Sequence, residues 1–169
     1  MIIRTETPTD YAAVQRLVQQ AFLNAAHSDG SEHLLVERLR HSDAFVPRLS
    51  LVAERQGEIV GHILFTKIRI GEAEALALAP LAVSLAHQKQ GIGKALIEQG
   101  HQRARELGFH YCVVLGDPNY YGRFGYQPAA NWQIRAPFDV PSEYFMAIAL
   151  QPSAPKIAGV VQYAKEFGL

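Results

Sequence analysis

The chain has 169 residues, of which 49% are hydrophobic, and it carries 16 basic and 16 acidic side chains. This length and composition predict one domain over residues 1–169 with a sizeable core, and they exclude a disordered chain. A formal net charge of zero without a basic block argues against nucleic acid or an anionic membrane as the principal partner.

Location and redox chemistry follow from a few features. The first residues, Met1–Arg4, are strand-like, and no stretch approaches the roughly 20 apolar residues that span a bilayer. The single cysteine, Cys112, lies inside an apolar run and can form no intrachain disulfide. We therefore expect a cytoplasmic protein in which Cys112 is a buried core residue and not a catalytic thiol.

The first third of the chain predicts two helices and a hairpin. Residues 7–10, Thr-Pro-Thr-Asp, resemble a helix start, and apolar residues then recur on one face up to Phe22. Ser31 caps a second expected helix that runs to Arg40, after a polar connection over residues 24–30. Two β-rich runs, 51–54 and 59–70, read as a hairpin.

The next expected strand, residues 75–83, changes phase near Pro80. Its large side chains stand at even positions before the proline and at odd positions after it. Because strand side chains alternate with period two, such a slip predicts a β-bulge. Strand pairing should break there and leave backbone groups free for the amides of an extended ligand, unless this is an ordinary bulged edge strand.

This strand leads through a Gln/Gly loop into a helix expected from Gly91 to Leu107, with Gly108 as its C-cap. Glycines let the backbone approach an anion, and the free N–H groups of a helix N-terminus attract it. The spacing excludes a dinucleotide fingerprint, because Leu96 stands where a third glycine is needed, and a P-loop, because Ala95 follows Gly-Lys. A pyrophosphate site and a simple glycine turn both remain open on this segment alone.

The last third begins with an apolar strand, residues 111–115, in the place that a parallel crossover requires. Asp117 and Pro118 then start a short helix that carries Tyr120 and Tyr121. Strand-like runs at 132–135 and 143–150 are expected to complete the sheet. The apolar segment 152–169 should pack on the domain or on a second subunit of a homodimer.

Two motifs together resemble the GNAT superfamily of N-acetyltransferases. Gln88-x-x-Gly91-x-Gly93 is similar to its acyl-coenzyme A signature, and residues 121–126, Tyr-Gly-Arg-Phe-Gly-Tyr, resemble its closing Tyr-x-x-x-Gly-aromatic motif. The resemblance covers most of residues 1–130, and residues 116–125 resemble a bacterial branch of predicted N-acetyltransferases. It implies an α/β (α+β) fold with a mixed, mostly antiparallel sheet, a splayed central parallel strand pair and flanking helices.

The resemblance also implies a reaction and its residues. Acetyl-CoA is the expected co-substrate, and an acetyl group passes directly to an amine in a ternary complex. Tyr121 is the expected general acid for the departing sulfur, with Tyr120 as the fallback or as a packing residue. The expected acetyl-CoA-binding residues are Leu81, Ala82, Val83, Gln88, Lys89, Gln90, Gly91, Ile92, Gly93, Lys94 and Tyr121.

The general base departs from the family pattern, because residues 75–81 contain no acid. A water relay or an acid of the first two helices, such as Glu32 or Glu37, would have to serve. His62 either lines the acceptor cleft or is a satisfied core histidine, and we favour the second interpretation. His27, His33 and Asp29 lack the spacing of a metal set, so we expect no metal.

Three functions remain in view. The main hypothesis is an acetyl-CoA-dependent N-acetyltransferase acting on a primary amine of a small molecule or peptide. The alternative is a catalytically silent acyl-CoA-binding or sensing domain, which the missing strand carboxylate favours. An enzyme that acetylates aminoacyl-tRNA is disfavoured by the zero net charge.

Overall fold

The computed structural model describes residues 1–25 and 28–169. Its helices are α1 (Tyr11–Phe22), α2 (Glu32–Arg40), α3 (Ile92–Glu106) and α4 (Pro118–Tyr121). Its strands are β1 (Ile2–Thr5), β2 (Phe45–Arg55), β3 (Glu58–Ile70), β4 (Ala73–Val83), β5 (Tyr111–Leu115), β6 (Gln127–Pro128), β7 (Ile134–Arg135), β8 (Phe145–Ala149) and β9 (Gly159–Gln162). Within the described residues, no helix is both long and apolar enough to cross a membrane.

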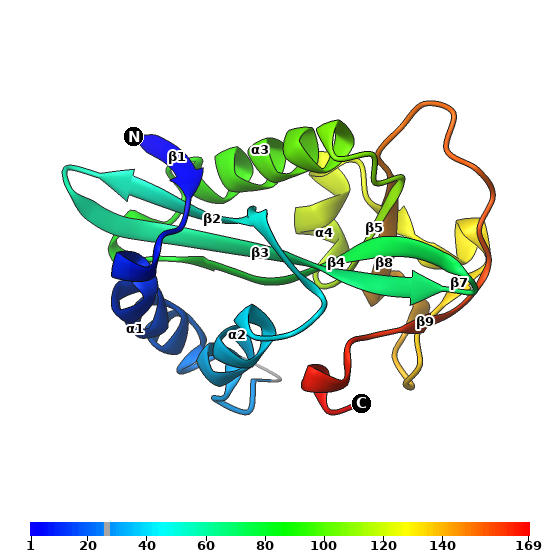
Figure 1. The fold of residues 1–169 in the computed structure, drawn as a ribbon, viewed down its shortest axis with the longest axis horizontal. Coiled ribbons are helices and arrows are strands. Elements are labelled where there is room, and N and C mark those ends of the chain that lie inside the picture. Colours follow the sequence, from blue (N-terminus) through cyan, green and yellow to red (C-terminus); the bar gives the residue numbers. More distant parts are fainter. Residues whose placement is uncertain (26–27) are drawn as a thin grey trace.

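The sheet has the order β1-β2-β3-β4-β5-β8-β6, with β9 paired to both β3 and β7. Helix α3 covers one face, and α1, α2 and the C-terminal segment cover the other (Figure 1). The two faces of β2 and β3 follow the side-chain alternation: Ile63 packs with α3, whereas Leu64 packs with α1. Apolar side chains therefore form a core on each side of the sheet.

The predicted bulge at Pro80 is confirmed. Ile63 pairs with Leu81 and Phe65 pairs with Leu78, so two residues of β4 stand opposite one residue of β3. Pairing with β3 resumes at Leu81 and continues to Val83. The bulge therefore shifts the register of β4 but does not by itself free the backbone of residues 81–83.

The opening in the sheet comes instead from the parallel pair. β4 and β5 pair only at Leu76 with Cys112 and at Ala77 with Val113. β4 runs on for six residues beyond Ala77, to Val83, without a partner on that edge. This splay confirms the expected central parallel pair and leaves backbone groups of residues 81–83 free on the β5 side.

Helix ends follow the expected chemistry. Gly91 is the N-cap of α3 with φ 83°, and Gly108 follows the other end with φ 86°. Asp117 caps α4, because its carboxylate accepts a hydrogen bond from the N–H of Asn119 at 2.9 Å. Ser31 is the N-cap of α2, and α1 continues directly from a short 3-10 turn over Pro8–Asp10. Part of the expected connection over residues 24–30, including His27, lies outside the described residues.

Two strand predictions need correction. Trp132 ends a 3-10 turn, Ala129–Trp132, and Gln133 has a φ of 59°, so only Ile134–Arg135 are extended. A 3-10 turn also occupies Ser142–Tyr144, and β8 begins at Phe145. β2, in contrast, begins at Phe45, six residues before the expected start, and its first part pairs irregularly with β3. Local periodicity could not reveal these tertiary effects.

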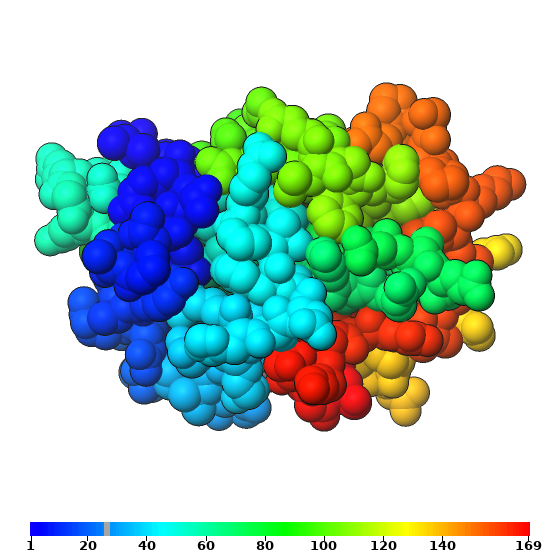
Figure 2. All heavy atoms as spheres, in the orientation of Figure 1, coloured from blue at the N-terminus to red at the C-terminus, as the bar shows by residue number. Residues whose placement is uncertain are grey.

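The C-terminal segment, expected to pack either on the domain or on a second subunit, packs on the domain. Val161 is buried and β9 pairs with the end of β3, while Phe167 contacts the core under α1 and α2. The backbone carbonyl of Glu166 accepts a hydrogen bond from Arg38 of α2 at 3.3 Å. Figure 2 shows these last residues pressed against α2 and the segment that follows it.

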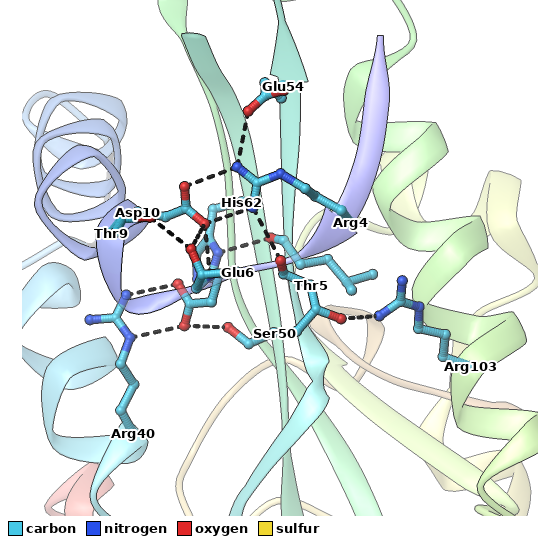
Figure 3. A network of polar contacts seen from close by, with 12 residues as sticks. Arg4, Thr5, Glu6, Thr9, Asp10, Arg40, Ser50, Glu54, His62 and Arg103 are labelled. Carbon is cyan, nitrogen blue, oxygen red and sulfur yellow. Dashed lines mark hydrogen bonds and ion pairs between the residues drawn. The ribbon is translucent and has the colours of Figure 1, made fainter. Parts of the chain in front are cut away.

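A polar network fastens α1 and α2 to the sheet (Figure 3). Arg40 of α2 and Glu6 form an ion pair at 2.9 Å, and both side chains are almost fully buried. Ser50 of β2 donates to Glu6 at 2.7 Å. Arg4 binds Asp10 at 2.7 Å, and this holds the pKa of Asp10 down at about 2. These contacts fix α1 and α2 against the sheet.

Candidate active site

A cleft of about 950 Å³ opens where β4 and β5 splay apart. One wall is the end of β4 and the loop into α3, and the other is α4 with the turn after it. Its lining residues are Leu81, Val83, His87, Gln88, Lys89, Gly91, Ile92, Gly93, Lys94, Glu98, Tyr120, Tyr121, Arg123 and Phe124. Two motifs that lie some 30 residues apart in the sequence thus face one another across a single cleft.

The first wall has the geometry of an anion site. The N–H of Ala95 bonds to the carbonyl of Gly91 at 3.0 Å, so the helical N–H groups of residues 92–94 precede the first helical bond. Gly91 adopts a left-handed conformation with open space around its Cα, and Gly93 has no room for a side chain. Lys89 and Lys94 also line the cleft and add positive charge. This arrangement suits a pyrophosphate group.

The second wall is aromatic. The rings of Tyr120 and Tyr121 meet edge to face with their centres 5.0 Å apart, and the centres of the Tyr120 and Phe124 rings lie 5.3 Å apart. The guanidinium of Arg123 lies 4.9 Å from the centre of the Tyr120 ring. Burial raises the pKa of the Tyr121 hydroxyl, with Tyr120 as a secondary cause. Tyr121 therefore remains a protonated donor at neutral and moderately alkaline pH.

A second cavity, of about 440 Å³, meets the cleft at Leu81 and Tyr121, which line both. Its walls come from the end of α1, the start of α2, the bulge of β4, the end of β5 and the C-terminal segment. Glu32 of α2 contributes a carboxylate to its lining. The molecule thus has two cavities with a shared tyrosine between them, as a two-substrate reaction requires.

Comparison with known proteins agrees with this geometry. Residues 12–126 match the family described as "Acetyltransferase (GNAT) family". The chain belongs to the GNAT family. This GNAT protein is 30% identical to the uncharacterized N-acetyltransferase YhbS of Escherichia coli K12, over 99% of this chain and 98% of that protein. It is 35% identical to YjhQ of the same strain, over 80% of this chain and 75% of that protein.

Solved structures of GNAT proteins share the whole fold. YhbS from Escherichia coli, in complex with CoA, gives a TM-score of 0.90 at 28% identity and covers 99% of this chain and 92% of that chain. A GNAT acetyltransferase from Brucella melitensis, in complex with acetyl-CoA, gives a TM-score of 0.82 at 36% identity and covers 98% and 97% of the two chains. These findings confirm the family, its bacterial branch and the fold class. The chain is an N-acetyltransferase, and acetyl-CoA is its co-substrate.

Most of the expected site residues of this GNAT domain meet in the first cleft, and two do not line it. The side chain of Ala82 points to the opposite face of β4 and packs in the core under α1. Gln90 turns away, and its side-chain oxygen accepts a hydrogen bond from Arg55 of the β2–β3 hairpin. Only their backbone groups remain as candidates for contact with acetyl-CoA.

Several lining residues of the GNAT cleft were missed. His87, Arg123 and Phe124 stand beside or inside the two motifs, so their neighbours could have indicated them. The aromatic side chains of the second cavity, Phe138 and Tyr163 among them, had no local signal. Tyr163 reaches the cavity because the C-terminal segment folds back onto the domain, and Phe138 stacks against Tyr163 there.

Of the acids and histidines weighed as site residues, some line a cavity and others do not. Glu32 lines the second cavity, whereas Glu37 is exposed and pairs with Arg40 at 3.1 Å. His62 is buried, lines neither cavity, and its Nδ1 lies 3.0 Å from the carbonyl of Leu51. Burial lowers the pKa of His62 to about 4, so it is a neutral core residue. His27, one of the histidines weighed for a metal, lies outside the described residues.

Cys112 lies behind the aromatic wall of the GNAT site. The Tyr126 hydroxyl donates to its sulfur at 3.3 Å, and Nε2 of His101 lies 2.8 Å from the same hydroxyl. Burial raises the pKa of the Cys112 thiol to about 12. This thiol is a core group, as expected, and it has no nucleophilic role at neutral pH.

Proposed function

We propose that this N-acetyltransferase acts on a primary amine of a small molecule or peptide, by direct attack in a ternary complex. The observation that carries this proposal is the junction of the two cavities at Leu81 and Tyr121. A thioester in the first cleft and an amine in the second would meet there. Such positioning removes much of the entropic barrier of a two-substrate reaction.

The residues divide the work of binding. The N-terminus of α3, with the loop residues Gln88 and Lys89, holds the pyrophosphate. Unpaired backbone groups of residues 81–83 bind the amide-rich arm, and an N–H there stabilises the charge that develops on the thioester oxygen. Tyr120 shapes the cleft by packing on Tyr121, and it is a reserve proton donor only.

The reaction balances when the nitrogen loses two protons and the sulfur gains one. An ammonium first loses a proton to water, and the free amine then forms the new C–N bond as the C–S bond breaks. The nitrogen loses its second proton to water, and Tyr121 delivers a proton to the departing sulfur, which leaves as the thiol of CoA. Water then reprotonates the Tyr121 phenolate, so that the whole reaction releases one proton. The raised pKa of Tyr121 keeps that proton available. Glu32 is the acidic side chain that faces the amine cavity.

The experiment is a comparison of wild type with Tyr121→Phe, in the presence of acetyl-CoA and a set of primary amines. We expect Tyr121→Phe to lower kcat by about a hundredfold or more, because general-acid catalysis is lost, with an unchanged Kd for acetyl-CoA. Tyr144→Phe, at an exposed tyrosine outside both cavities, is the control and should keep full activity. Binding of acetyl-CoA without transfer to any amine would favour a catalytically silent acyl-CoA-binding domain instead.

A further inference from the structure

The second cavity has an unusual lining for a site that takes an amine. Besides Tyr121, four aromatic side chains from three separate segments line it: Phe22 of α1, Phe138, and Tyr163 with Phe167 of the C-terminal segment. The rings of Phe138 and Tyr163 stack with their centres 6.3 Å apart, and the centres of the Tyr163 and Phe167 rings lie 5.0 Å apart. Phe138, Tyr163 and Phe167 therefore form one continuous aromatic wall of this cavity, which the bulge of β4 also lines.

A charged side chain lines this cavity. Among the described residues that line it, Glu32 alone carries a charged side chain. Both carboxylate oxygens of Glu32 accept from the Ser28 hydroxyl at 2.8 Å, which limits how the side chain can rotate. Glu32 also stands in the first turn of α2, where the helix dipole favours a negative charge. The carboxylate is therefore fixed in position at the cavity wall.

We infer that the acceptor is a small arylalkyl monoamine, with its ammonium on Glu32 and its ring against Phe138, Tyr163 and Phe167. One carboxylate matches one ammonium, and aromatic faces attract both a ring and a cation. A polyamine or an aminoglycoside would bring further charges into an apolar space, where the described lining residues offer no second acidic side chain to pair them, and this is unfavourable. A volume of about 440 Å³ suits a small molecule.

This inference rests on the proposed function, so its test begins with acetyl-CoA binding by calorimetry. Acetyl transfer is then followed as release of CoA thiol with 2-phenylethylamine, ethylamine, spermidine and kanamycin. We expect kcat/KM for 2-phenylethylamine to exceed each of the other values about tenfold or more. Of the four probes, only this one carries both a ring for the aromatic wall and a single ammonium for Glu32.

Variants separate the two halves of the recognition. Glu32→Gln should raise the KM for 2-phenylethylamine about tenfold or more, with the KM for acetyl-CoA unchanged. Glu37→Gln, which removes the same charge from the outer side of α2, should leave both constants unchanged. Phe167→Leu keeps an apolar side chain and should reduce the preference for 2-phenylethylamine over ethylamine.

The outcomes distinguish this inference from the function on which it rests. Absence of acetyl-CoA binding would defeat the proposed function and the inference with it. Binding with faster acetylation of spermidine or kanamycin would overturn the inference alone, as would a Glu32→Gln enzyme with an unchanged KM for the amine. Binding without transfer to 2-phenylethylamine would equally overturn it and leave the assignment of the cleft intact.

Discussion

Gly93 of α3 faces the hydroxyl of Tyr120 so closely that a methyl group at Gly93 would overlap that oxygen. The first residues of the anion site therefore touch the aromatic wall that closes the cleft. Gly93 has ordinary helical backbone geometry, so its lack of a side chain serves this close approach and not a special conformation. Gly91 differs, because its φ of 83° favours glycine while the space around it is open.

Gly93→Ala should weaken acetyl-CoA binding, because the new methyl group displaces Tyr120 into the cleft. We expect a loss of about tenfold in affinity, measured by calorimetry. The double variant Gly93→Ala with Tyr120→Phe removes the overlapping oxygen and should recover most of that loss. Equal affinities for the single and double variants would contradict this contact.

Gly116, at the end of β5, supports Tyr121 in the same way. A Cβ at Gly116 would meet the Tyr121 ring at its Cε2 and at 2.8 Å from its Cδ2. Gly116→Ala should therefore move the proton donor and lower kcat about tenfold or more, with little change in acetyl-CoA affinity. Gly122→Ala is the matched control, because a Cβ at Gly122 meets no atom within 4 Å. Steady-state kinetics of both variants check this expectation.

The cleft could be predicted from sequence because its chemistry is local. A cap glycine at Gly91 and a tyrosine on a short capped helix each leave a signature within a few residues, whereas the crowding of Gly93 by Tyr120 appears only in the structure. The sequence also predicts that strand pairing breaks near Pro80, but the structure shows that the short parallel pairing of β4 with β5, and not the bulge, produces the opening.

The acceptor cavity could not be predicted in this way. Its residues come from α1, α2, the end of β5 and the C-terminal segment, so only tertiary folding brings Phe22 and Tyr163 together. Trp132 shows the same limit, because its β-rich neighbourhood predicted a strand where tertiary contacts impose a turn. Glu32 was a candidate acid among several, and its position at the cavity, not its sequence context, selects it.

The activity should rise with pH across the neutral range. A primary amine must lose a proton before it attacks, and its pKa lies near 10. Burial raises the pKa of Tyr121 above its usual value, so the proton donor is not lost below about pH 10. We expect kcat/KM to increase without a descending limb between about pH 6 and pH 9.5. A bell-shaped profile with a maximum near pH 8 would argue against Tyr121 as the acid.

The buried Arg40–Glu6 pair should dominate the stability of the acceptor side. Arg40→Met leaves the Glu6 carboxylate buried without its partner and should lower the free energy of unfolding by about 3–5 kcal/mol. Arg48→Met breaks the exposed pair with Glu106 and should cost about 0–1 kcal/mol. Urea unfolding monitored by circular dichroism compares the two. Equal losses would refute the special role of the buried pair.

Two buried histidines should make the fold sensitive to mild acid. Burial lowers the pKa of His62 and of His101 to about 4, whereas an unfolded histidine has a pKa near 6.5. The unfolded state binds more protons between these values, so stability is full above about pH 6.5 and falls toward pH 4. We expect a loss of about 2 kcal/mol per histidine at pH 5.

A His62→Gln variant checks this assignment by urea unfolding at several pH values. Its free energy of unfolding should fall less steeply with acid than that of wild type, whatever its absolute stability. Asp10 does not affect this comparison of pH dependence. Its pKa is about 2, so its contribution to the free energy of unfolding changes only at lower pH. An unchanged slope would show that His62 is not the titrating group.

The central claim is that the N-terminus of α3 holds acetyl-CoA in the cleft between β4 and α4. Calorimetric titration of wild type and Gly91→Glu with acetyl-CoA tests it most directly. Gly108→Glu is the matched control, because Gly108 has the same left-handed geometry and open surroundings at the opposite end of the same helix. We predict micromolar binding by wild type and Gly108→Glu, and loss of binding in Gly91→Glu, whose carboxylate would lie in the anion site. Equal binding by all three proteins, or none by wild type, would contradict the account.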